Sequence, residues 1–238
     1  MAFPNHISQE YENQLEDIRS KVLTMGGLVE QHLAKAIDAL ALGKAQLADE
    51  VAGSDFKVNA LELSIDEECT EIIARRQPAA SDLRLVLAVI KTIRDLERVG
   101  DEAAKVSRMA SRLIETESPK SYYINVVAMG NHVKRVLHDT LDSFARMDAA
   151  AALKLAREDE AVDRENDAIM RQLITYMMED PRTISRVMNV IWAARALERI
   201  GDHSRNICEY IIYLVKGKDV RHTSLDQVEK EILGGSGH

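Results

Sequence analysis

The sequence has few cysteines and no hydrophobic segment of membrane-spanning length. Two cysteines, Cys69 and Cys208, are too few for a secreted disulfide scaffold and argue against a zinc site built on thiolates. No apolar run approaches the roughly 20 residues that a transmembrane helix needs. The segment Met1–His6 has neither the charged nor the apolar region of a secretory signal peptide. We therefore expect a cytoplasmic protein.

Helix-breaking residues and strand signals are also scarce. The 238 residues include only 4 prolines and 11 glycines, with no Asn-Gly or Asp-Gly hairpin signal and no alternating β-branched run. The stretches between the prolines are rich in Ala, Leu, Glu, Arg and Lys, which favour helix. Apolar residues recur at a spacing of three to four, as in Val86, Ile90, Ile93 and Leu96, which indicates helices with a buried stripe. An all-α fold is predicted.

The net charge is −8, because 39 acidic residues outnumber 31 basic ones. A general nucleic-acid binder is normally basic, so we do not expect direct binding to DNA.

The helical pattern divides the chain into six long segments and a tail. We predict helices near residues 8–43, 46–75, 80–115, 121–149, 152–178 and 183–215. Residues 216–238 are predicted to form a C-terminal tail, and its end, Gly234–His238, is flexible by composition.

The six predicted helices are two sets of three. Met25-Gly26 is repeated 104 residues later as Met129-Gly130. Later in the chain, the segment LERVGD is repeated 101 residues on as LERIGD, with only Val replaced by Ile. Internal repeats are a fold-level signal. We predict two tandem three-helix bundles, residues 1–117 and 121–215, packed into one elongated body with a break near Pro119.

Each repeat carries one Glu-x-x-x-Asp motif in its last helix. Residues four apart share a helix face, so Glu97 neighbours Asp101 and Glu198 neighbours Asp202. In both helices these carboxylates continue an apolar stripe, which predicts partial burial. Partly buried carboxylates need a cation, because an unpaired buried charge is penalised by desolvation.

Further oxygen ligands lie at helical spacing. The stripe of the sixth helix continues to Asn206 and Glu209, which we add to the predicted metal ligands. The second helix of each repeat offers possible further ligands: Asp55, Asn59, Glu62 and Asp66 in one, and Asp159, Asp163 and Asn166 in the other. Oxygen ligand sets suit Mg²⁺, Mn²⁺, Ca²⁺ or iron better than a structural zinc site of Cys and His, although zinc on oxygen ligands stays open.

The two motifs differ downstream. Lys105 in the first repeat stands where Asn206 stands in the second. We expect the second site to bind metal better, or the first to use Lys105 as an internal counter-charge. Gly100 and Gly201, inside the motifs, each cost roughly 1 kcal/mol relative to alanine in a helix. A close helix–helix approach or a ligand cluster would offset that cost.

Other interpretations of these residues remain open. The carboxylates could pair only with arginines such as Arg98 and Arg199, and the second-helix stripe could be a solvated face. His203 could ligate a metal but is more often a surface or packing residue. Trp192 is expected to be a core or interface aromatic, and Cys208 a small packing residue.

The repeated motifs resemble those of the PhoU family. The resemblance covers residues from about Ile7 to Lys216, and its most specific pieces are Ile93–Asp101, Ala196–His203 and Arg75–Arg84. It implies a cytoplasmic, non-enzymatic and commonly dimeric protein that binds metal clusters at Glu-x-x-x-Asp. It also implies a repressor of the phosphate-starvation response. In that role it would link the ATPase subunit of the phosphate ABC transporter to a sensor histidine kinase, and would restrain phosphate uptake.

Two alternatives come from other classes. The first is a helical carboxylate-bridged di-metal enzyme, an oxidase or hydrolase, which needs an open coordination position and a substrate pocket. The absence of the Glu-x-x-His pair of di-iron bundles argues against the oxidase form. The second is a purely structural helical dimer whose acidic pairs make only ion bridges.

Overall fold

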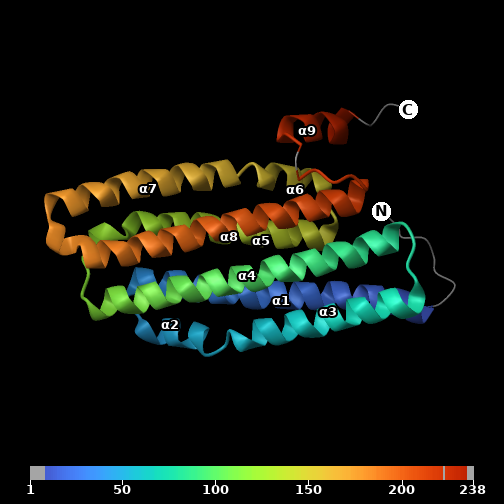
Figure 1. Cartoon of the computed structure of the whole chain (residues 1–238), viewed down its shortest axis with the longest axis horizontal. Helices are drawn as coiled ribbons and strands as arrows, with labels where there is room; N and C mark the ends of the chain where they lie inside the picture. Colours follow the sequence, from blue (N-terminus) through green and yellow to red (C-terminus); the bar gives the residue numbers. More distant parts are fainter. Residues whose placement is uncertain (1–8, 222, 235–238) are drawn as a thin grey trace.

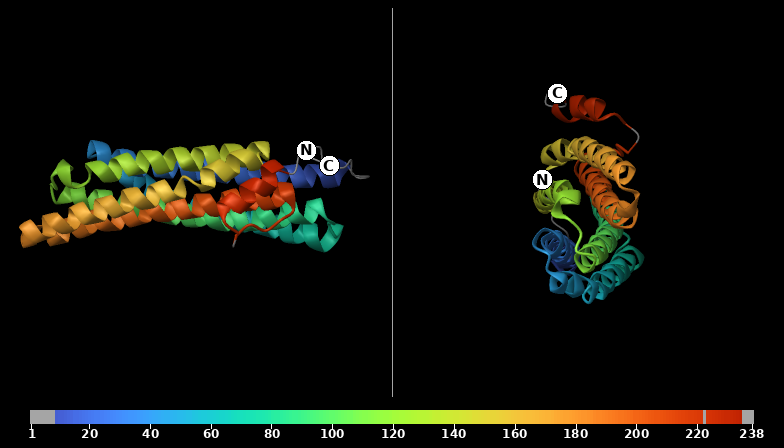
Figure 2. Two further views of the ribbon diagram at one scale, coloured as in Figure 1. Left: turned by 90° about the horizontal axis from the view of Figure 1, so that it is seen from above. Right: turned by 90° about the vertical axis from the view of Figure 1, so that its left-hand side faces the viewer.

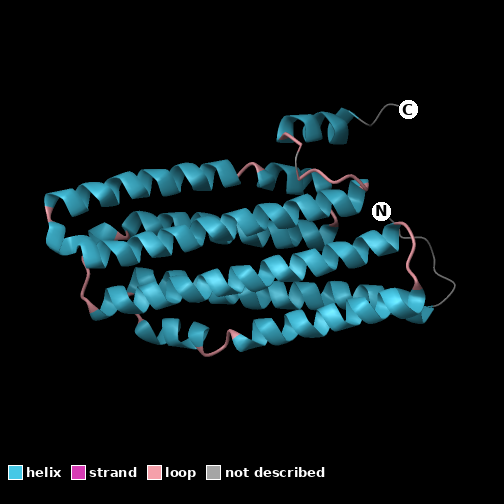
Figure 3. Cartoon of the chain, viewed as in Figure 1, coloured by secondary structure: helices cyan, strands magenta, loops and turns pink. Residues whose placement is uncertain are grey.

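The computed structural model describes residues 9–221 and 223–234, and this part of the chain is helical with no strand (Figure 3). The expectations about Met1–His6 and about residues 235–238 lie outside the described residues. The prediction of an all-α, elongated body is confirmed (Figure 1). None of the described helices is both long enough and apolar enough to cross a bilayer.

The helices fall into two corresponding series. The first is α1 (Gln9–Leu42), α2 (Ala45–Ala52), α3 (Phe56–Arg76) and α4 (Ser81–Glu115). The second is α5 (Ile124–Arg146), α6 (Ala149–Ala156), α7 (Asp159–Glu179) and α8 (Ile184–Lys216), with 3₁₀ turns η1 (Lys120–Tyr122) and η2 (Pro181–Thr183). A last helix, α9 (Leu225–Gly234), follows.

The second predicted helix of each repeat is two helices, which corrects the sequence interpretation. In the first repeat the break falls at Gly53-Ser54, where the Ser54 hydroxyl donates to the Glu50 carbonyl at 2.7 Å and lies 2.8 Å from His32 Nε2. In the second it falls at Arg157-Glu158. In the first repeat the poor helix formers Gly53, Ser54 and Asp55 mark the break, whereas Arg157 and Glu158 in the second repeat are good helix formers and give no such signal.

The two series pack against each other through equivalent close approaches of α1 and α5. A Cβ on Gly26 would lie 2.7 Å from Leu141 Cδ2, and a Cβ on Gly130 would lie 3.0 Å from Ile37 Cγ1. Gly130 follows Gly26 by 104 residues, and Leu141 follows Ile37 by the same offset, so the two contacts are copies of one another. A Cβ at either position would force the facing side chain to shift, so glycine allows the two helices to lie this close.

The contact between α4 and α8 is the most extensive in the molecule and forms the centre of the core. Seen end-on, the helices of the first series lie on one side of the body and those of the second on the other (Figure 2). Both helices carry fully buried apolar residues, among them Ile93 and Leu96 on α4 and Leu197 and Ile200 on α8.

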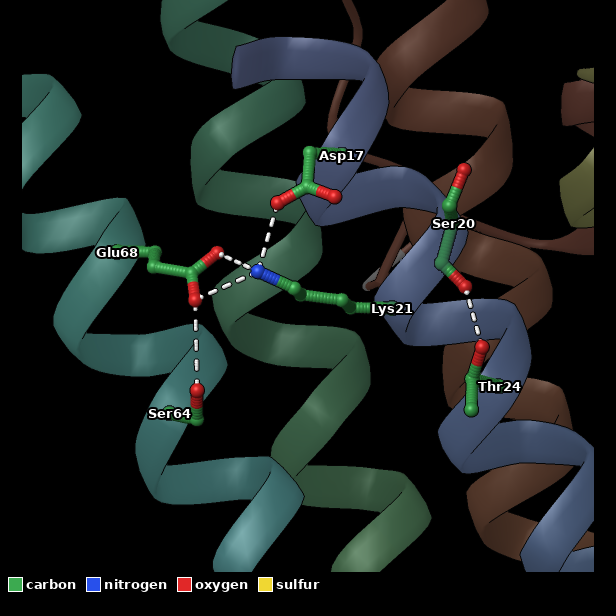
Figure 4. A network of polar contacts seen from close by, with 6 residues as sticks. All are labelled: Asp17, Ser20, Lys21, Thr24, Ser64 and Glu68. Carbon is green, nitrogen blue, oxygen red and sulfur yellow. Dashed lines mark hydrogen bonds and ion pairs between the residues drawn. The ribbon is translucent and has the colours of Figure 1, made fainter. Parts of the chain in front are cut away.

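Ion pairs tie the outer helices to the inner ones. Lys21 on α1 donates to both carboxylate oxygens of Glu68 on α3, at 2.8 and 2.7 Å, and also pairs with Asp17 at 2.6 Å (Figure 4). Ser64 donates to Glu68 at 3.3 Å. These groups are partly exposed, so each pair contributes about 0–1 kcal/mol and serves chiefly to fix the register of α3 on α1.

The predicted tail contains a docked helix. Val228 on α9 is 1% exposed, and α9 packs against α6. Arg157 pairs with Asp226 at 2.8 Å and with Glu229 at 2.7 Å. Leu225, Val228 and Ile232 recur at a spacing of three to four, so the segment carries a helical pattern that the prediction of a tail overlooked.

Candidate metal centre

Each Glu-x-x-x-Asp motif contains a glycine at which the last helix of a repeat lies close against its neighbour. On α4, a Cβ at Gly100 would lie 3.3 Å from Val58 Cγ1 and 3.8 Å from Asp55 Oδ1, both on or beside α3. The missing side chain therefore brings the start of α3 against the motif. This close approach is the compensation expected for a glycine inside a helix.

The second repeat reproduces this arrangement. A Cβ at Gly201 on α8 would lie 3.3 Å from Val162 Cγ1 and 3.5 Å from Asp159 Oδ1 on α7. Asp159 follows Asp55, and Val162 follows Val58, by the same 104 residues. The glycine, the valine and the aspartate thus form one structural unit that occurs twice.

In the first repeat the carboxylates are close enough to perturb one another. Burial, the charge of Asp101 and the charge of Glu62 raise the pKa of Glu97 above its ordinary value. Burial and Asp101 likewise raise the pKa of Asp55. The first acidic cluster therefore comprises Asp55, Glu62, Glu97 and Asp101.

In the second repeat the pattern is similar. Partial burial, Asp202 and Asp163 raise the pKa of Glu198, while burial and Asp163 raise that of Asp202. Burial is also the main cause of the raised pKa of Asp159, whose side chain is 4% exposed. The second acidic cluster therefore comprises Asp159, Asp163, Glu198 and Asp202.

The donor set fits a cation. Asp55 Oδ1 and Asp159 Oδ1 are buried and have no hydrogen-bond partner, and each faces the glycine of its motif. Buried carboxylate oxygens without donors are unfavourable, and a bound cation would remove the penalty. Within residues 9–221 and 223–234, however, no three His, Cys, Asp or Glu side chains are already arranged around a common metal position. Binding at either cluster would require side-chain movement.

The two clusters differ in the cationic side chains that pair with them. The expectation that Lys105 is the counter-charge of the first cluster is not met. Lys105 Nζ lies 2.7 Å from Oε1 of the buried Glu102, which it neutralises, and no ion pair joins it to Glu97 or Asp101. In the second repeat, Arg205 donates to Asp159 Oδ2 at 3.1 Å. The fixed counter-charge therefore belongs to the second cluster. In the first, the charge of Arg108 acts on Asp55.

Several predicted ligands have other partners. Asn206 Nδ2 donates to Asp95 at 3.2 Å, and Glu209, 7% exposed, pairs with Arg205 at 3.4 Å. Asn59 is exposed, and the charge of Asp66 acts on Cys69. Asn166 is half-buried, with an unpartnered Oδ1, and lines a cleft together with Glu198 and Asp202.

A polar cluster between α4 and α8 escaped the sequence interpretation. Asp95, whose side chain is 5% exposed, accepts hydrogen bonds from His203 Nδ1 at 2.7 Å and from Asn206. Its hydrogen bond with Tyr210 contributes, after burial, to the raised pKa of that phenol. In the second repeat the residue that corresponds to Asp95 by the 101-residue offset is Ala196. Asp95 is therefore not repeated, and the comparison of the two repeats gave no signal for this cluster.

Cys208 and Trp192, both on α8, lie in different environments. Cys208 is buried and packs as expected, with its sulfur 3.5 Å from Thr140 Oγ1. Trp192 is 51% exposed, so it is not a core residue. It lines a cleft of about 660 Å³ between α4, α7 and α8, into which the second acidic cluster opens through Glu198 and Asp202.

Comparison with known proteins agrees with this architecture. Residues 22–110 and 126–211 match the PhoU domain family, one segment in each repeat. The chain belongs to the PhoU family. Family members include the "Phosphate-specific transport system accessory protein PhoU homolog" of Pseudomonas aeruginosa, 52% identical over 99% of this chain and 98% of the relative. The "Phosphate-specific transport system accessory protein PhoU" of Escherichia coli K12 is 48% identical over 96% of this chain and 95% of the relative.

Solved PhoU structures have the same fold. The crystal structure of PhoU from Pseudomonas aeruginosa matches with a TM-score of 0.85 at 52% identity, covering 87% of this chain and 100% of that one. The phosphate transport system regulatory protein PhoU from Streptococcus pneumoniae matches at 0.81 and 28%, covering 88% and 99%. PhoU proteins are accessory and regulatory proteins rather than enzymes, so the di-metal enzyme alternative is set aside. The chain has a regulatory role in phosphate uptake.

Proposed function

We propose that the chain is a negative regulator of phosphate uptake and an indirect repressor of the phosphate-starvation response. It acts in the cytoplasm as a metal-binding adaptor. One partner is the ATPase subunit of the phosphate ABC transporter, and the other is a sensor histidine kinase. The support is membership of a family whose relatives are named as accessory proteins of the phosphate-specific transport system.

The observation that carries the metal part is the duplicated acidic cluster with a buried, unpartnered aspartate oxygen in each copy. Asp55, Glu97 and Asp101 would hold one cation, and Asp159, Glu198 and Asp202 the other. An Mg²⁺, Mn²⁺, iron or Zn²⁺ ion would supply positive charge that holds α3 on α4 and α7 on α8. The protein would thereby keep the shape of a docking surface, and signalling would be a change in partner binding.

The metal part is tested by metal analysis of protein purified without an affinity tag, because the histidines of a tag bind metal. Glu97→Ala with Asp101→Ala should remove the metal of one cluster, and Glu198→Ala with Asp202→Ala that of the other. Glu160→Ala with Asp167→Ala is the matched control, since it removes two carboxylates from exposed positions of α7 outside the cluster. Equal metal content in all variants would contradict the assignment.

The adaptor part is tested by a pull-down from phosphate-replete cells with mass spectrometry as readout. Recovery of a sensor kinase and a phosphate-transporter ATPase is expected. Recovery of neither, under conditions that preserve a known weak complex, would contradict the adaptor. Repeating the pull-down with Glu198→Ala and Asp202→Ala separates a regulatory metal from an incidental one. The expected homodimer is checked in the same preparations by light scattering.

A further inference from the structure

The 101-residue offset relates residues at one end of the α4–α8 interface to residues at the other end. Side chains pack over each other at one end, here called the filled end, whereas the other end has a cleft, here called the open cleft. At the filled end, the Lys91 ammonium lies 5.5 Å from the ring centroid of Tyr210 and 5.3 Å from that of Tyr213. At the other end, Trp192 occupies the position that corresponds to Lys91. Its indole is half exposed and lines the cleft of about 660 Å³. That volume lies within the roughly 300–1,000 Å³ of small-molecule sites.

The open cleft is lined by four cations, and two of them make no ion pair with a described carboxylate. Lys105 and Arg199 share Glu102 Oε1, at 2.7 and 3.0 Å. Arg108 and Arg195 line the same cleft. Across the residues that the structure describes, neither of them forms an ion pair within 4.0 Å. Guanidinium groups that are not held in an ion pair are suited to bidentate contacts with phosphate.

The cleft also contains hydrogen-bond acceptors that lack a donor. Glu102 Oε2 and Asn166 Oδ1 are both buried and unpartnered. Inorganic phosphate at neutral pH offers few donors and no ring, so it would leave these acceptors and the exposed indole unused. Sugar hydroxyls and base amino groups provide donors, and a flat base provides a face for stacking.

We propose that this cleft binds a nucleoside di- or triphosphate. The base stacks on Trp192, and the phosphates pair with Arg108 and Arg195. The cation that accompanies the phosphates would be met by Glu198 and Asp202, and this last element rests on the metal site proposed above. The stacking and arginine contacts do not depend on it.

Trp192 makes the test direct, because it is the only tryptophan of the chain. Fluorescence excited at the indole is followed during titration with ADP or ATP, with and without Mg²⁺, and calorimetry measures the same binding. We expect saturable quenching with either nucleotide. Binding should persist in EDTA but weaken, since the phosphate charge is then opposed by Glu198 and Asp202.

Single substitutions separate the cleft from a general basic surface. Arg195→Ala and Arg108→Ala should each weaken nucleotide binding about tenfold or more, the effect of losing a charge-assisted hydrogen bond. Trp192→Ala, followed by calorimetry, should weaken it by about tenfold through lost stacking. Arg94→Ala is the matched control, because Arg94 is exposed and corresponds to Arg195 at the filled end. It should leave binding unchanged.

Three results would overturn the proposal. One is the absence of saturable binding by both fluorescence and calorimetry at millimolar nucleotide. Another is equal affinity for inorganic phosphate or for an acidic peptide such as polyglutamate. The third is Mg²⁺-dependent binding that Arg195→Ala and Trp192→Ala leave intact, which would assign the nucleotide to the metal cluster alone. Failure of the adaptor or of metal binding would appear in the pull-down and metal analysis, without abolishing binding in EDTA.

Discussion

Asp95 Oδ1 lies 2.7 Å from His203 Nδ1, and the pair joins α4 of one repeat to α8 of the other inside the central interface. An ionised carboxylate only accepts hydrogen bonds, so His203 carries its proton on Nδ1. Asn206 and Tyr210 give the same carboxylate two further donors. One buried charge therefore organises three side chains across the boundary between the repeats.

Replacing Asp95 by Ala should lower the free energy of unfolding by about 2–4 kcal/mol, because three donors lose one shared acceptor. Urea unfolding followed by circular dichroism measures the change. Asp167→Ala, at an exposed position, should change stability by no more than about 0.5 kcal/mol. A loss below about 1 kcal/mol for Asp95→Ala would show that water replaces the carboxylate.

Neighbouring glycines on α1 should respond to alanine in opposite directions. At Gly26 the new Cβ would meet Leu141 at 2.7 Å, so Gly26→Ala should destabilise by roughly 1–3 kcal/mol through overpacking. At Gly27 nothing lies within 4 Å of the new Cβ, and Gly27→Ala should stabilise by about 0.5–1 kcal/mol. Thermal unfolding of the two variants checks the prediction. Equal shifts would mean that the α1–α5 contact is looser than the structure indicates.

The two cysteines should be inert in the native protein. Burial raises the pKa of both Cys69 and Cys208 to about 12. At pH 8 only about one thiol in ten thousand is then ionised, and the thiolate is the reactive form. A chromogenic disulfide reagent should find almost no reactive thiol in native protein and two in guanidinium chloride. Rapid reaction of one equivalent in native protein would mean that a helix opens locally.

Docking of α9 should depend on its apolar contact more than on its ion pairs. Val228→Asp places a charge in a site that is 1% exposed and should release the helix. Arg157→Ala removes two ion pairs whose side chains are substantially exposed, and should have little effect. Amide hydrogen exchange of residues 225–234 distinguishes the outcomes. Equal loss of protection in both variants would indicate docking by electrostatics.

Removing Arg205 should strengthen cation binding at the second cluster. Arg205 occupies Asp159 Oδ2, and a cation at that carboxylate competes with it. Calorimetric titration with Mn²⁺ should therefore show higher affinity for Arg205→Ala than for the wild type. Lys105→Ala should not change the affinity of the first cluster, because Lys105 pairs with Glu102. Weaker binding in Arg205→Ala would mean that the arginine positions Asp159 for the metal.

The sequence predicted the helical class, the duplication and the pairing of the motifs with the second helices. These features could be predicted because helical periodicity and the internal repeat each extend over many residues, so single exceptions do not hide them. It missed the breaks at Gly53-Ser54 and Arg157-Glu158. Helix-forming residues run through the second break, whereas the first was marked by the poor helix formers Gly53, Ser54 and Asp55. It also did not anticipate the contacts that Asn206 and Lys105 make with Asp95 and Glu102. Both lie on the expected helix face, but whether each turns toward the motif or toward a neighbour is decided by Asp95 and Glu102. Those partners come from packing between helices, which spacing along one helix does not contain.

The paired contacts of Gly26 with Leu141 and of Gly130 with Ile37 are those of an isologous interface, as in a twofold-symmetric homodimer. In a homodimer every substitution appears in both subunits, on both sides of the twofold axis. When the two halves are repeats of one chain, a residue of one repeat can be substituted without changing its counterpart in the other. Lys91 at one end and Trp192 at the other are the result of that freedom. Covalent linkage of the halves thus allows a symmetric scaffold to carry two different surfaces.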